Sequence, residues 1–236
     1  MFDFLLLSPL ETQVVVLSLK VALLSLAINL PLAVAVAYLL ARYRFPGKSL
    51  LNALVYLPLV LPPVVTGYLL LLTLGTQGPV GAWLKDTFGI VVAFRWTGAA
   101  IAAAVMGFPL AVGAIRLSID AVDRRIEDAA STLGANRAWI FLTITLPLIL
   151  PGIITGAILA FARALGEFGA TITFVANIRG ETQTLPLAIY SLTQVPGKEM
   201  AALRLLIISV LLSFAALIAS EVLHKTVSKR MFGHGD

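Results

Sequence analysis

The sequence contains no cysteine and only two histidines among its 236 residues. The absence of thiols excludes a disulfide framework and thiolate metal sites. Both histidines, His224 and His234, fall in the C-terminal tail, so we expect them to be solvated and predict no metal site. Charge is also scarce, with 12% charged against 59% hydrophobic residues and a mean hydropathy of +0.98. Such a composition indicates a membrane protein rather than a soluble domain.

Long uncharged runs separated by short polar segments predict membrane-spanning helices rather than the alternating strands of a barrel. In lipid the backbone must satisfy its hydrogen bonds internally, which a helix does within one segment. We therefore predict an all-α, polytopic membrane protein with a single transmembrane domain over residues 1–236. The first residues carry no basic region or small-residue cleavage site, so no cleaved signal peptide is expected. Five spans are predicted, at about 14–41, 50–74, 96–115, 138–162 and 201–223.

Small or polar side chains recur every four residues in three of these spans, a spacing that lets membrane helices pack closely. We interpret Asn29 as an interhelical hydrogen-bonding group, with a place in a transport path as the alternative. Pro147 and Pro151 are expected to bend the inner end of the fourth span. The three seams are Ser25, Asn29, Ala33, Ala37 and Ala41; Ala99, Ala103, Gly107 and Ala111; and Gly152, Gly156, Ala160 and Ala164.

The second span is unusual because Pro58, Pro62, Pro63 and Gly67 lie in its middle. Proline removes backbone hydrogen bonds and kinks a helix. A membrane tolerates the freed carbonyls where neighbouring helices or a hydrated route satisfy them. This pattern favours a kinked helix that lines a translocation path, and a packing kink is the alternative.

Two oppositely charged residues, Arg163 and Glu167, follow the uncharged core of the fourth span one turn apart. The spacing predicts an ion pair on one helix face. Contact between Arg163 and an anionic substrate is the alternative interpretation. The mixed sequence of residues 166–196 then predicts a half-buried outer segment.

The segment 124–147 is the main cluster of charges between two apolar runs. Asp123 is a predicted N-cap, Gly134 stands at the expected C′ position, and a second helix should begin near Asn136. These features predict a short surface helix, a turn and a second helix. Its apolar face is expected to consist of Ile119, Val122, Ile126, Ala130 and Leu133, which recur at three- and four-residue steps.

This segment resembles the signature of bacterial ABC importer permeases, which reads E-A-A, three residues, G, nine residues, I-x-L-P. Asp128-Ala129-Ala130, Gly134, Ile144 and Leu146-Pro147 match it, with aspartate in place of the usual glutamate. In that family the loop contains a cytoplasmic coupling helix that docks on the ATP-hydrolysing subunit. The resemblance implies this role for a coupling loop at about 117–137, and a solvated loop helix is the alternative. The implied contact residues are Glu127, Asp128, Ala129, Ala130, Leu133 and Gly134.

Further segments, at 43–72, 104–123, 141–148 and 162–178, are similar to the permease family of molybdate ABC importers. This resemblance implies a type I importer permease that forms a homodimer with two ABC ATPase subunits. An external molybdate-binding protein, periplasmic or extracellular, would deliver the ion, and the ATPase subunits would bind ATP and Mg. Tungstate, or sulfate and thiosulfate, remain alternative cargoes. No nucleic-acid partner is expected.

The chain itself has no P-loop, paired catalytic carboxylates or metal-ligand cluster, so we predict no catalytic residue, no cofactor and no enzyme activity. A dianion enters lipid only at high cost, so the route must be polar or hydrated. An ion-coupled secondary transporter and a membrane-embedded enzyme are the rival classes. Candidate residues for the path or gate are Asn29, Pro62, Pro63, Thr66, Thr155, Arg163, Glu167 and Thr171.

The distribution of basic residues predicts the orientation in the cytoplasmic (inner) membrane. If the charged segment is cytoplasmic, the inner side holds ten of the 17 Lys and Arg. The excess of positive charge inside predicts an outer N-terminus and a cytoplasmic C-terminus. The ten are Arg42, Arg44, Lys48, Arg116, Arg124, Arg125, Arg137, Lys225, Lys229 and Arg230.

Overall fold

The computed structural model describes residues 8–232, in which every regular element is helical. The side chains of His224, Lys225, Lys229 and Arg230, and all of His234, lie outside the described residues, so the predictions made for them are not addressed. The elements are α1 (Pro9–Arg42), α2 (Lys48–Val60), α3 (Pro63–Leu74), α4 (Pro79–Phe88), α5 (Trp96–Ala121), α6 (Arg124–Thr132), α7 (Arg137–Ile140), the π-helical turn η2 (Phe141–Thr145), α8 (Leu146–Leu148), α9 (Leu150–Leu165), α10 (Gly169–Val175), α11 (Leu185–Thr193) and α12 (Glu199–Phe232).

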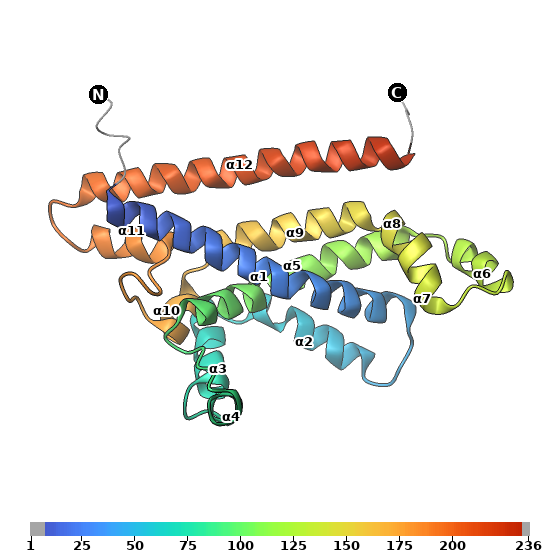
Figure 1. Ribbon diagram of the computed structural model, residues 1–236, viewed down its shortest axis with the longest axis horizontal. Coiled ribbons are helices and arrows are strands. Elements are labelled where there is room, and N and C mark those ends of the chain that lie inside the picture. Colours follow the sequence, from blue (N-terminus) through green and yellow to red (C-terminus); the bar gives the residue numbers. More distant parts are fainter. Residues whose placement is uncertain (1–7, 233–236) are drawn as a thin grey trace.

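Three long helices form the centre of the molecule. Helices α1 and α5 run in the same direction, and α9 packs against both in the opposite direction (Figure 1). All the predicted seam residues of these helices are buried. A Cβ atom at Gly107 would lie 3.2 Å from the Ala160 carbonyl oxygen, and one at Gly156 would lie 3.1 Å from that of Ala111. The close packing predicted from the four-residue spacing is confirmed.

Length and composition identify three single helices able to cross a membrane: α1, α5 and residues 199–219 of α12. Two bent helix pairs raise the number to as many as five if each pair counts as one span. The prediction of about five spans agrees with this count. Helix α12 lies along one side of the bundle against α9 and α11, and most of its described side chains are exposed (Figure 1).

The second span is not the single kinked helix that we predicted. Helices α2 and α3 meet at an angle of 117°, with Leu61 and Pro62 between them. Both residues precede a proline, which disfavours helical ψ, and their ψ angles are 141° and 135°. The consecutive prolines therefore stop the helix, whereas the lone Pro58 remains inside α2.

The fourth span bends by 68° between α8 and α9, at Ile149. Just before the bend the backbone widens into η2, where the N–H of Leu146 donates to the carbonyl of Phe141. Pro147 and Pro151 lack the N–H groups that would continue the regular ladder. The predicted proline bend is confirmed, and the wider turn places Thr145 in the interior with no exposed surface.

The outer segment predicted to be half-buried contains two short helices, α10 and α11. Phe174, Val175 and Leu187 are fully buried there, whereas residues 178–180 and 193–196 are exposed, so the predicted half-buried character is confirmed. Helix α10 packs against α3 with little space between the backbones. A Cβ atom at Gly67 would lie 2.8 Å from the Ala170 Cα atom. The broken second span is thus held against α10.

Candidate functional site

Local capping interactions define the short helix α6 and the turn that follows it. The Asp123 side chain accepts a hydrogen bond from the N–H of Arg125 at 2.9 Å, as expected of an N-cap. After Leu133 the chain turns at Gly134, whose φ is +87°, a conformation that favours glycine. Asn136 then caps α7 by accepting from the N–H of Trp139 at 2.8 Å. The three residues predicted to begin or end these helices, Asp123, Gly134 and Asn136, are confirmed in those positions.

Helix α6 projects from one end of the bundle, and none of its residues is buried (Figure 1). Leu133, which ends it, is 88% exposed, and Ile126 is 47% exposed. The apolar face is therefore uncovered. Two residues predicted on this face lie elsewhere, because Ile119 is buried within α5 and Val122 ends that helix. The predicted coupling loop of 117–137 accordingly includes the last turn of α5.

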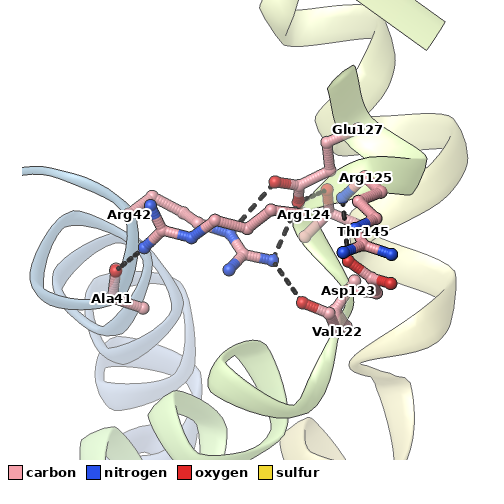
Figure 2. A network of polar contacts seen from close by, with 8 residues as sticks. All are labelled: Ala41, Arg42, Val122, Asp123, Arg124, Arg125, Glu127 and Thr145. Atoms are coloured by element: carbon pink, nitrogen blue, oxygen red, sulfur yellow. Dashed lines mark hydrogen bonds and ion pairs between the residues drawn. The ribbon is translucent and has the colours of Figure 1, made fainter. Parts of the chain in front are cut away.

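A charged network attaches α6 to the rest of the chain (Figure 2). The guanidinium of Arg42, at the end of α1, contacts both oxygens of the Glu127 carboxylate, each at 3.1 Å. The Thr145 hydroxyl of η2 donates to the same carboxylate at 2.7 Å. The ion pair is nearly buried, with 8% of the Arg42 side chain and 14% of the Glu127 side chain exposed. Charge-assisted hydrogen bonds are short and strong in such surroundings.

Two backbone carbonyls complete this network. Arg42 also donates to the Val122 carbonyl at 3.3 Å, and Arg124 donates to the Ala41 carbonyl at 2.9 Å. The last carbonyls of a helix lack intrahelical partners, so the Arg124 contact satisfies the end of α1. The end of α1, the turn between α5 and α6, and η2 are thus joined around Glu127.

The two neighbouring carboxylates of the segment have different surroundings. Glu127 faces the network, whereas Asp128 is exposed and has no ion pair within residues 8–232. Ala129 is exposed and Ala130 partly exposed. Sequence reasoning missed Arg42 and Thr145 as partners of Glu127, although Thr145 lies inside the I-x-L-P part of the signature. Their contacts span 85 and 18 positions in the chain, which local patterns do not reveal.

The ion pair predicted at the outer end of α9 is present. Arg163 Nη1 contacts Glu167 Oε2 at 2.5 Å, and Glu167 Oε1 accepts from the N–H of Ala170 at 2.8 Å. The Glu167 side chain is 1% exposed and that of Arg163 is 27% exposed. Glu167 therefore links α9 to the start of α10.

The remaining path candidates lie on four helices. Asn29 donates from Nδ2 to the Ala104 carbonyl at 3.0 Å, so the predicted interhelical hydrogen bond is present. It lines a groove of about 390 Å³ between α1, α2 and α5 that contains none of the other candidates. Thr66 and Thr171 are buried on the packed helices α3 and α10, and Thr155 donates to the Pro151 carbonyl of its own helix at 2.9 Å. In the grooves described within residues 8–232, Asn29 is the one candidate that forms part of a lining.

Comparison with known families decides the class of this chain. Residues 29–229 match the family described as the inner membrane component of binding-protein-dependent transport systems. The chain belongs to this family. It is therefore a multi-pass inner-membrane component of a transporter, and such components are not themselves enzymes.

Curated relatives share much of this sequence. Over 220 residues it is 57% identical to the molybdenum transport system permease protein ModB of Escherichia coli K12. The aligned region covers 93% of this chain and 96% of the relative. The ModB protein of Haemophilus influenzae is 53% identical over 226 residues, covering 96% and 98% of the two chains. The sulfate transport system permease protein CysT of Escherichia coli K12 is more distant, at 36% identity over 93% of this chain and 80% of the relative.

Solved structures show the same fold at low identity. One is a bacterial ABC transporter involved in the import of alginate, with a TM-score of 0.73, 18% identity and coverage of 98% of this chain and 82% of that chain. Another is the MetNI methionine ABC transporter in an inward-facing conformation, with a TM-score of 0.72, 15% identity and coverage of 94% and 99%. This member of the family thus has the all-α fold of a type I ABC importer permease.

Proposed function

We propose that this chain is the permease subunit of an ATP-driven importer that moves molybdate across the cytoplasmic membrane. The supporting observation is 57% identity over nearly the whole length to a molybdenum permease, against 36% to a sulfate permease. Molybdate and tungstate are tetrahedral dianions of similar size, so we extend the proposal to tungstate. Sulfate is the alternative cargo.

The proposed assembly contains two copies of this chain, two ABC ATPase subunits and an external binding protein. Ile126 of α6 and Leu133, the residue that caps the end of this helix, are apolar and exposed, which supports docking of the helix on the ATPase. Exposed apolar side chains beside charged ones are typical of interaction sites. A structural relative in complex with its ligand-bound periplasmic protein supports the external partner. ATP and Mg would be bound by the ATPase subunits, with no cofactor in this chain.

The orientation proposed from basic residues agrees with the arrangement of the helices. Helix α6, the end of α1 and the described end of α12 lie at one end of the molecule (Figure 1). The start of α1 and helix α11 lie at the other end. With α6 on the cytoplasmic side, the N-terminus is outside and the C-terminus is inside.

The network around Glu127 supplies a route by which movement of the ATPase would reach the membrane. A shift of α6 acts on α1 through Arg42 and on the broken fourth span through Thr145. Because α1, α5 and α9 are closely packed, we propose that they move as a unit. We propose Glu127, Asp128, Ala129, Ala130, Leu133 and Gly134 as the coupling residues.

The proposed path lies in the outer half of the molecule. Pro62 and Pro63 create the break beside α10, and Arg163 with Glu167 holds the adjoining end of α9. These groups would form a gate that opens as the helices shift. Asn29, Thr66, Thr155 and Thr171 remain proposed lining residues, which would have to meet across the two copies.

The function is tested by uptake of labelled molybdate in cells that lack this permease and then receive it on a plasmid. We expect ATP-dependent uptake that tungstate competes with strongly and sulfate weakly. Stronger competition by sulfate than by tungstate would favour the alternative cargo. Accumulation by vesicles containing this chain alone, without ATP or partners, would contradict the importer mechanism itself.

A further inference from the structure

A groove of about 480 Å³ lies between α1, α11 and α12, at the end of the molecule opposite α6 (Figure 1). Its inner wall is apolar and includes the buried residues Val14, Ala188 and Leu205. Its rim includes the exposed side chains of Arg179 and Lys198. The groove thus combines an apolar interior with a basic edge.

The charges of the groove do not balance. Glu11 is the one carboxylate that lines it, and this carboxylate is already engaged by Arg204, whose Nε and Nη2 lie 3.0 and 2.9 Å from its Oε1 atom. The second oxygen of Glu11 accepts from the N–H of Ser8 at 2.7 Å. Arg179 and Lys198 have no ion pair within residues 8–232. They are two basic side chains at the rim without an ion-pair partner at contact distance in that part of the chain.

Two carboxylates lie close in sequence to these basic residues and reduce the local excess of positive charge. Glu199 follows Lys198 directly, and its Oε1 atom accepts from the N–H of Gly197 at 3.1 Å. Glu181 is two residues beyond Arg179. Neither carboxylate belongs to the groove lining. An anion seated at the rim would meet Arg179 and Lys198, and Glu11, the one carboxylate of the lining, is already held by Arg204.

The predicted spans place the groove at a membrane surface. Helix α1 begins at Pro9 and α12 at Glu199, and both are helices with the length and composition of a span. With the spans beginning at about residues 14 and 201, as predicted, the first turns of both helices lie at the level of the headgroups. Basic side chains at this level interact with lipid phosphates, while apolar side chains just beneath them contact acyl chains.

We propose that this groove binds an anionic phospholipid, whose phosphate is held by Arg179 and Lys198. The first part of an acyl chain lies against Val14, Leu192 and Leu205. A volume of about 480 Å³ is within the range of small-ligand sites, roughly 300–1,000 Å³. Free phosphate would use the basic rim but leave the apolar wall uncovered, which is why the observations favour a lipid. The site does not depend on which ion the protein transports.

The test compares lipid binding by the purified full assembly, measured by native mass spectrometry during titration with phosphatidylglycerol or phosphatidylcholine. We expect the assembly to prefer phosphatidylglycerol. In the double variant Arg179→Gln/Lys198→Gln we expect affinity for phosphatidylglycerol to fall about 30-fold, from two lost basic contacts. The double variant Lys85→Gln/Arg95→Gln removes two exposed charges elsewhere and should bind as the unchanged protein does.

A second variant tests the apolar part without changing charge. Ala201→Trp places a bulky ring in the groove from α12 and should also reduce phosphatidylglycerol binding. An unchanged lipid preference in the Arg179/Lys198 variant, or an equal loss in the Lys85/Arg95 control, would overturn the proposal. So would displacement of the lipid by inorganic phosphate at equal concentration, which would indicate a site for small anions. Unchanged lipid binding with lost stimulation by the binding protein would assign the surface to that protein instead.

Discussion

Arg42 and Glu127 form a nearly buried ion pair that connects the end of the first long helix to the short projecting helix α6. The two residues are 85 positions apart in the sequence. Thr145 adds a third element by donating to the same carboxylate. Movement of α6 relative to α1 must therefore break or carry along this pair.

Loss of the Glu127 carboxylate should weaken the structure itself. Glu127→Ala leaves the Arg42 guanidinium nearly buried without its partner, a change that costs about 3–5 kcal/mol in comparable pairs. Asp128→Ala, at the exposed neighbour, should leave thermal unfolding of the purified permease close to that of the unchanged protein. Equal melting temperatures for both variants would contradict the anchoring role. The double variant Arg42→Met/Glu127→Met should recover most of the stability, because no charge is left unpaired.

Leu133 should matter for assembly rather than for folding. It is 88% exposed, so Leu133→Ser removes almost no contact within the chain and should change permease stability by less than about 0.5 kcal/mol. If α6 docks on the ATPase, the same variant should lose at least about tenfold in ATPase affinity. Co-purification of a tagged ATPase measures this loss, with Leu133→Met as the conservative control. Undiminished co-purification of the Leu133→Ser variant would argue against docking through this residue.

A larger side chain at Gly156 should destabilise the protein by disturbing the contact between α5 and α9. Its Cβ position is 3.1 Å from the Ala111 carbonyl, so Gly156→Val must separate the helices and should cost about 1–3 kcal/mol. Gly166→Ala is the matched control, because its Cβ atom would have only the Ala162 carbonyl nearby, at 3.9 Å. Thermal unfolding in detergent compares the two. A Gly156→Val protein as stable as the control would show that the helices separate without cost.

The ion pair between Arg163 and Glu167 can be tested for a role in transport as well as in stability. Arg163→Met leaves the buried Glu167 carboxylate unpaired and should destabilise the protein, whereas Arg163→Met/Glu167→Gln should restore stability. The glutamine can still accept from the N–H of Ala170. If Arg163 contacts the anion, molybdate uptake by the stable double variant should remain at least tenfold below normal. Normal uptake with normal stability would make the pair purely structural.

Local chemistry in the sequence predicted much of this architecture. The cap at Asp123, the turn at Gly134, the four-residue seams and the bend near Pro151 each depend on residues within one or two helical turns. The prediction of a kink between α2 and α3 was wrong. Two successive residues each precede a proline there, and both adopt extended ψ angles that end the helix. The contacts of Glu127 with Arg42 and Thr145 could not be predicted, since they arise only when distant segments pack.

The uncovered apolar surface of α6 has a consequence for how the cell must make this protein. Without an ATPase seated on it, Leu133 and Ile126 face the cytoplasm in the proposed orientation. Permease copies without an ATPase would expose this apolar surface to chaperones, proteases and one another. On the proposed docking, permease made in excess of the ATPase would keep the patch formed by α6 and Leu133 exposed, so we expect such copies to be degraded faster than assembled ones.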